Sequence, residues 1–168
     1  MRALARLNRF LERACEASVT VIVPVMLAVM AAQVFLRYVF NVSLSWSEEL
    51  TLTLFCWTVM LMGALGVKQG LHVRMSVFIE RLRGRARVRA ERLIHLATAG
   101  LGGFLGVSAW RYVAETRGTT SAAIGYPIGV LYASALVCGV LIALFALEAL
   151  LAGRVPADEG EPERHAGV

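Results

Sequence analysis

Few residues of this 168-residue chain belong to the types that perform chemistry, and their spacing does not group them. The histidines, His72, His95 and His165, lie far apart, and the three cysteines occur singly, so neither a zinc site nor a disulfide framework is expected. The one lysine, Lys68, follows Val67, which excludes the GxxxxGK phosphate loop. No nucleophile has a base near it in the sequence. We therefore predict a protein that is not an enzyme and holds no metal or cofactor.

The densest group of polar and aromatic residues lies between positions 37 and 57. Ser45 and Glu48 have the S-x-x-E spacing of a capping box, whose side chains bond to the backbone at a helix start. Two carboxylates, Glu48 and Glu49, in a first turn also suit the positive end of the helix dipole. Tyr38 and Trp46 are placed as membrane-surface aromatics. On this interpretation the group starts a helix and marks the membrane boundary.

A second interpretation makes the same group a docking surface for another protein. One carboxylate is enough for a capping box, and Arg37 lies across a short loop from both, so an Arg–Glu pair is expected at the membrane edge. Glu49, Thr53, Trp57 and Met60 continue along one helical face at spacings of three and four. Both interpretations stay open from the sequence. Loss of a partner on replacement of Glu49 by alanine would favour the second.

The composition indicates that these residues belong to a membrane protein. The chain is 58% hydrophobic and 17% charged, with a mean hydropathy of +0.66, whereas a soluble domain is about 45–50% apolar and about 25% charged. Four long uncharged stretches have 20, 18, 18 and 30 residues, and a helix needs roughly 20 apolar residues to cross a bilayer. Because backbone groups in lipid must be bonded internally, we predict an all-α integral membrane protein with four transmembrane helices. The expected spans cover residues 15–36, 49–68, 92–112 and 127–151.

The ends of these spans need separate arguments. Residues 118–126 are rich in Gly, Thr and Ser and precede Pro127, so we expect an ordered loop and a last helix that starts near the proline. Leu4, Leu7 and Leu11 share one helical face between arginines, which suits either an amphipathic surface helix or an extension of the first span. The apolar run that follows is too long for a signal peptide. We expect one membrane domain over residues 1–152 and a disordered tail over 153–168.

The distribution of cations predicts the orientation of the chain. Fourteen of the seventeen basic residues fall on the side of the termini and of the connection between the second and third spans. The positive-inside rule places this side in the cytoplasm. His72 in this connection is expected to cap a helix, contact lipid phosphate or bond to a partner. Anionic lipid headgroups are expected to bind Arg81, Arg83, Arg85, Arg87 and Arg89.

The expected spans carry no ionisable residue near their centres. Ion pathways and proton relays depend on such residues, because only function retains them in the membrane. The hydroxyl groups present can be satisfied on their own helices. We therefore expect a subunit whose work depends on a partner protein.

Glycine spacing predicts close helix packing at three places. Gly66–Gly70, Gly102–Gly106 and Gly125–Gly129 are small-xxx-small spacings, which let helix backbones approach each other. Only the second lies well inside an expected span. Packing within the chain is favoured for these sites over contact with a partner.

The order of the residues across positions 37–72 resembles that of the small membrane subunit, called DctQ-like or Q-type, of tripartite ATP-independent periplasmic (TRAP) transporters. The similarity covers residues 10–152 and includes the four spans and the Gly125–Pro127 start of the last one. The chain departs from the family at Ser76, where an acidic residue is frequent, and at Ile128 and Gly129, where an aromatic residue is frequent. The matching residues are Arg37, Tyr38, Asn41, Trp46, Glu48, Glu49, Trp57, Gly63, Ala64, Gly70 and His72.

The resemblance implies partners and a role in the bacterial inner membrane. It implies a large membrane subunit that carries the sodium and substrate sites and moves by an elevator motion, and a periplasmic binding protein that delivers an organic acid. The small subunit would brace the scaffold of the large one without binding substrate, and no nucleic-acid partner is expected. The partner-interface candidates are Arg37, Tyr38, Asn41, Trp46, Glu48, Glu49, Thr53, Trp57, His72 and Pro127.

A membrane anchor of a redox complex is the alternative, because such anchors also use four short spans. A haem-binding anchor needs a histidine well inside a helix, and only His95, about one turn into the third span, comes near. A colourless purified protein would count against this alternative.

Overall fold

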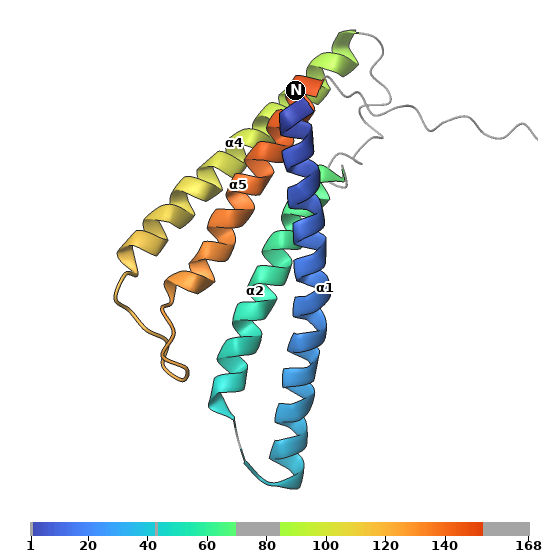
Figure 1. The fold of residues 1–168 in the computed structure, drawn as a ribbon. Helices are drawn as coiled ribbons and strands as arrows, with labels where there is room; N and C mark the ends of the chain where they lie inside the picture. Colours follow the sequence, from blue (N-terminus) through green and yellow to red (C-terminus); the bar gives the residue numbers. More distant parts are fainter. Residues whose placement is uncertain (1, 43, 70–84, 153–168) are drawn as a thin grey trace, which may run out of the picture.

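The computed structural model describes residues 2–42, 44–69 and 85–152, and these fold into four helices (Figure 1). They are α1 (Arg2–Val39), α2 (Ser45–Lys68), α4 (Arg85–Glu115) and α5 (Gly129–Ala152). Each contains a stretch long and apolar enough to cross a membrane. The prediction of an all-helical protein with four membrane-length helices is confirmed. The expected tail over 153–168 lies outside the described residues.

The helices do not pack in the order of the sequence. Helix α4 packs against α5, α5 also packs against α2, and α2 packs against α1. We call the end that holds the first residues of α1 the terminal end, and the end that holds the α1–α2 and α4–α5 connections the loop end. At the loop end, the α1–α2 connection lies beyond the α4–α5 connection (Figure 1). The buried core joins α1, α2 and α5 through Cys15, Leu61, Ala64, Leu65, Cys138, Leu141 and Phe145.

Glycines bring α4 and α5 into direct backbone contact. A Cβ atom added to Gly139 would lie 2.5 Å from the backbone nitrogen of Gly106, and one added to Gly102 would lie 2.8 Å from that of Ala143. No side chain fits at these positions without a backbone shift. The structure thus confirms packing within the chain for the Gly102–Gly106 spacing. Gly125, in contrast, lies in a loop with a φ of +77°.

The N-terminal segment is an extension of the first span. Helix α1 runs unbroken from Arg2 to Val39, through Pro24. Asn8 on this segment is buried and bonded to α5, and Leu11 packs against the core, so the segment stays in line with the bundle. The interpretation as a separate surface helix is wrong, because these contacts with α5 outweigh the amphipathic pattern.

The start of α2 differs from the sequence-based expectation, whereas α5 starts near Pro127 as expected. The residue that caps α2 is Leu44, without a side-chain cap, so the predicted capping box of Ser45 and Glu48 is wrong. The Ser47 hydroxyl instead donates to the Leu44 carbonyl at 2.6 Å. Helix α5 starts two residues after Pro127, because the backbone N–H of Ile128 bonds back to the preceding loop.

Candidate interaction sites at the two ends of the bundle

At the loop end, the carboxylate of Glu49 is bound by the α4–α5 connection. It accepts hydrogen bonds from the Ser121 hydroxyl at 2.5 Å and from the backbone N–H groups of Ala123 at 3.1 Å and Ile124 at 3.0 Å. Helix α2 positions Glu49 one turn from its start. The carboxylate therefore serves as an anchor for a loop more than seventy residues away in the sequence.

The same face of α2 continues this contact one and two turns further on. The hydroxyl groups of Thr53 and Tyr126 lie 2.7 Å apart, and the indole Nε1 of Trp57 donates to the Val130 carbonyl at 3.2 Å. Met60 packs against the core. The polar groups on this face are thus used within the chain, and a role of this face in partner binding stays a prediction.

The α4–α5 connection is an ordered loop, as expected. An isolated antiparallel bridge joins Thr120 and Pro127, and the backbone N–H of Ser121 donates to the Tyr126 carbonyl at 2.8 Å. The φ of +77° at Gly125 favours glycine, because side chains rarely adopt it. Pro127 lies in this loop rather than on a surface of α5. Glu49 and Thr53 therefore bind this loop, and Trp57 binds the first turn of α5.

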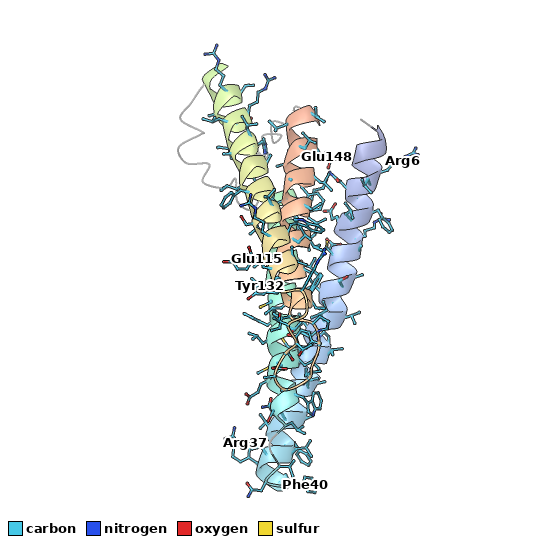
Figure 2. The ribbon with its side chains drawn as sticks, turned by 90° about the vertical axis from the view of Figure 1, so that its left-hand side faces the viewer. Arg6, Arg37, Phe40, Glu115, Tyr132 and Glu148 are labelled. Atoms are coloured by element: carbon cyan, nitrogen blue, oxygen red, sulfur yellow. The ribbon has the colours of Figure 1, made fainter. Side chains whose placement is uncertain are left out.

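The α1–α2 connection forms an exposed tip beyond this loop. Figure 2 shows Arg37 and Phe40 at this end of the molecule, with Glu148 and Arg6 at the other. The tip exposes 83% of Tyr38 and 45% of Trp46. We define the exposed tip by the candidate residues Arg37, Tyr38, Asn41 and Trp46, all of them solvent-accessible.

The expected pair between Arg37 and a carboxylate does not form. Glu49 is bound by the loop, and Glu48 accepts a hydrogen bond from the Gln33 amide at 3.3 Å. Within the described part of the chain, the structure gives Arg37 no ion pair. The prediction of an Arg–Glu pair is wrong, because α1 extends past the start of α2 and carries Arg37 beyond both carboxylates.

At the terminal end, a buried ion pair joins three helices. Lys68 Nζ at the end of α2 lies 2.5 Å from Glu148 Oε2 on α5, and Asn8 Nδ2 on α1 donates to the same oxygen at 2.8 Å. Asn8 also donates to the Leu144 carbonyl at 3.2 Å, and the ammonium of Lys68 lies 5.5 Å from the centre of the Phe145 ring. Asn8 is 0% exposed. This polar junction, defined by Asn8, Lys68 and Glu148, fixes the relative positions of α1, α2 and α5.

The sequence analysis missed this junction. It considered Lys68 only in excluding a phosphate loop and gave Glu148 no role. The two residues are 80 positions apart, so no local spacing links them. The sequence did hold a signal for this pair, because Lys68 and Glu148 each lie at the terminal end of an apolar span.

The basic candidates lie partly outside the described residues. Arg89 is exposed on α4, and Arg85 and Arg87 belong to the first turns of that helix. His72, Arg81 and Arg83 lie outside the described ranges, as does Gly70. Lipid binding by the five arginines stays a prediction.

Several hydroxyl groups inside the helices bond to their own backbone, as expected, whereas the buried hydroxyl of Thr51 has no hydrogen-bond partner in the described part of the chain. Thr58 donates to the Leu54 carbonyl and Thr98 to the Ile94 carbonyl, both at 2.9 Å. Among residues 2–42, 44–69 and 85–152, no three His, Cys, Asp or Glu side chains cluster as metal ligands would. The polar chemistry of the described helices is therefore that of packing and anchoring.

A known protein family matches most of the chain. Residues 26–154 match the family described as tripartite ATP-independent periplasmic transporters, DctQ component. The chain belongs to the DctQ family. Since this family is a component of a membrane transporter, the protein is not an enzyme, and its four apolar helices lie in the bacterial inner membrane.

A curated relative agrees with this assignment. The chain is 29% identical over 83 residues to the C4-dicarboxylate TRAP transporter small permease protein DctQ of Vibrio cholerae serotype O1. The aligned segment covers 49% of this chain and 36% of that relative. The relative therefore supports membership of the DctQ family over about half of the chain.

Proposed function

We propose that the chain is the small membrane subunit of a sodium-coupled TRAP transporter that takes up an organic acid, such as a C4-dicarboxylate, a sialic acid or another carboxylate. The match of residues 26–154 to the DctQ family carries this proposal. The partners are the large membrane subunit and a periplasmic binding protein. Both termini and the α2–α4 connection face the cytoplasm, where most basic residues lie.

In this proposal the subunit does not bind the transported acid. The N–H groups of the α4–α5 loop already bind Glu49, and Lys68 is paired with Glu148, so neither of these groups is free to bind a carboxylate substrate. A cleft of about 210 Å³ between α1 and α2 carries a carboxylate of its own, which repels an anion. It is lined by Glu16, Val19, Thr20, Met62, Leu65, Gly66 and Gln69.

The role left to the subunit is to brace the scaffold of the large subunit. Hydrogen bonds tie its helices together at both ends, through Glu49 at the loop end and through the polar junction at the terminal end. Such links make the subunit one rigid unit, as a brace requires. The exposed tip of α1 and α2 and the outer faces of the helices are then available to the large subunit.

Deletion of the gene tests the transport role. Uptake of a radiolabelled C4-dicarboxylate or sialic acid should fall to background and return when the chain is supplied in trans, and uptake should require a sodium gradient. An affinity-tagged chain should co-purify a large membrane subunit. Normal uptake of every tested carboxylate on deletion, together with no co-purified membrane protein, would contradict the proposal.

A further inference from the structure

The cleft between α1 and α2 contains a charged group that the chain itself leaves unused. The two helices pack side by side, and Glu16 of α1 contributes its carboxylate to the lining of the cleft (Figure 1). Glu16 is exposed, and within the described part of the chain the structure gives its carboxylate no hydrogen bond and no ion pair. A carboxylate without a partner attracts a cation.

The other polar groups of the cleft offer further hydrogen-bond acceptors. The Thr20 hydroxyl donates its hydrogen to the Glu16 carbonyl at 2.8 Å, so its oxygen keeps lone pairs that can accept. Gln69, at the end of α2, offers the oxygen of its side-chain amide. The lining that the structure describes contains no cationic side chain. The group that complements this set is therefore a cation with several N–H donors.

The cleft changes from polar to apolar along its length. Helix α1 runs away from the terminal end and α2 runs toward it, so Glu16 and Gln69 lie at the end of the cleft nearest the terminal end. Val19, Met62 and Leu65 line the part farther from that end. Glu16 is also the last charged residue before the uncharged stretch of α1, which places the polar part near the membrane surface. A ligand that fits both parts has a polar head and an apolar tail.

We propose that this cleft binds a phospholipid whose headgroup carries a primary ammonium, namely phosphatidylethanolamine. The ammonium lies against Glu16, Thr20 and Gln69, and one acyl chain follows the apolar part of the cleft. A primary ammonium has three N–H donors, one for each of these acceptors. A basic side chain of a partner protein could also meet the acceptors, but only a lipid supplies an acyl chain for the apolar part as well.

The acceptors predict which headgroups the cleft selects. Phosphatidylcholine has the same positive charge as phosphatidylethanolamine but no N–H donor, and phosphatidylglycerol has no cation. Hydrogen bonds to a charged group are stronger than neutral ones, so the loss of the N–H donors is expected to weaken binding. Arg13, three positions before Glu16 on α1, is exposed and attracts the phosphate that all three lipids share. Arg13 therefore adds affinity, whereas Glu16 provides the selectivity.

Native mass spectrometry of the purified full chain in detergent tests the proposal. The probes are phosphatidylethanolamine, phosphatidylcholine and phosphatidylglycerol with identical acyl chains, and the measured quantity is the Kd of the first bound lipid. We expect the parent chain to bind phosphatidylethanolamine at least about five-fold more tightly than either of the other lipids.

Three variants assign this preference to the cleft. Glu16→Gln removes the charge at an exposed position and should raise the Kd of phosphatidylethanolamine to that of phosphatidylcholine. Glu115→Gln is the matched control, because it removes one exposed carboxylate at the loop end of α4 and should leave the preference unchanged. Arg13→Gln should weaken the binding of phosphatidylethanolamine and phosphatidylcholine by the same factor. Unchanged melting temperatures check that each variant is folded.

Equal Kd values for the three lipids in the parent chain would overturn the proposal. A preference that survives Glu16→Gln, or that Glu115→Gln removes to the same extent, would also overturn it. If the parent chain shows no preference and Glu16→Gln instead abolishes co-purification of the large subunit, a basic side chain of that subunit occupies the cleft. None of these measurements involves transport, so failure of the lipid site is distinct from failure of the proposed transport role.

Discussion

The two ends of the bundle are held by different kinds of interaction. At the terminal end, Asn8 and Lys68 meet the buried carboxylate of Glu148, so one acidic group joins three helices. At the loop end, Glu49 binds hydroxyl and backbone N–H groups of one connection, and its surroundings are open to solvent. A buried charge is expensive to leave without a partner, whereas an exposed one is solvated by water. The terminal end is therefore expected to carry more of the stability.

The largest effect is expected at the terminal end. Replacement of Glu148 by alanine leaves Lys68 charged, largely buried and without its partner, which should lower the unfolding free energy by about 3–5 kcal/mol. Thermal unfolding of the purified chain in detergent measures this. The double replacement Glu148→Leu with Lys68→Met should recover much of the loss. A loss below about 1 kcal/mol for the single variant would contradict the comparison of the two ends.

The contact between α4 and α5 lies between the two ends and should give the next largest effect. Gly139→Ala places a Cβ atom 2.5 Å from the backbone of α4, and the forced shift should cost about 1–3 kcal/mol. Gly103→Ala is the matched control, because its Cβ meets nothing within 4 Å. Equal melting temperatures for the two variants would be inconsistent with backbone contact at Gly139.

A smaller loss is expected where α2 meets the start of α5. Trp57→Phe keeps an aromatic ring but removes the indole hydrogen bond to the Val130 carbonyl, which should cost about 1 kcal/mol. Chemical unfolding followed by circular dichroism measures the change. Trp110→Phe on the exposed face of α4 serves as the control and should leave the stability unchanged.

At Glu49 the effect should be local. Glu49→Gln keeps one carbonyl oxygen and removes the charge that binds Ser121, Ala123 and Ile124, so the loop should open more often. Hydrogen exchange of residues 119–126 should become faster while exchange in α5 stays the same. Unchanged loop exchange would show that this carboxylate does not hold the loop.

The smallest effect on stability is expected at the exposed tip. Tyr38→Ala removes a side chain that is 83% exposed, so the unfolding free energy should change by less than about 0.5 kcal/mol. If the tip contacts the large subunit, as proposed, co-purification of that subunit should fall. If the Tyr38→Ala and Trp46→Ala variants both still co-purify the large subunit fully, the exposed tip is not part of the interface.

Much of the fold was predictable because it depends on local properties. Charge-free stretches of membrane length identify helices, since lipid leaves the backbone no other way to bond. The Gly102–Gly106 spacing likewise predicted close packing, although not its partner Gly139. The predicted capping box at Ser45 does not form. The hydroxyl of Ser47, a serine two positions later, bonds to the Leu44 carbonyl instead.

The candidate site was only partly predictable. Sequence spacing correctly placed Glu49, Thr53 and Trp57 on one face, but it could not show that this face meets the chain's own loop. It paired Arg37 with a carboxylate, because it could not show that α1 continues past the start of α2. Such errors arise because sequence periodicity does not show how far neighbouring helices are shifted along the bundle relative to one another.

The sequence by itself determined that the chain is a four-helix membrane protein of the TRAP small-subunit type, because hydropathy, charge distribution and a motif across positions 37–72 are all local. Only the tertiary structure decided that Glu148 binds both Lys68 and Asn8, and that Gly139 on α5 meets Gly106 on α4. These features depend on contacts between residues 33 to 140 positions apart. Their geometry depends on how the helices pack against one another. The residues that meet in this packing lie far apart in the sequence, so local patterns do not pair them.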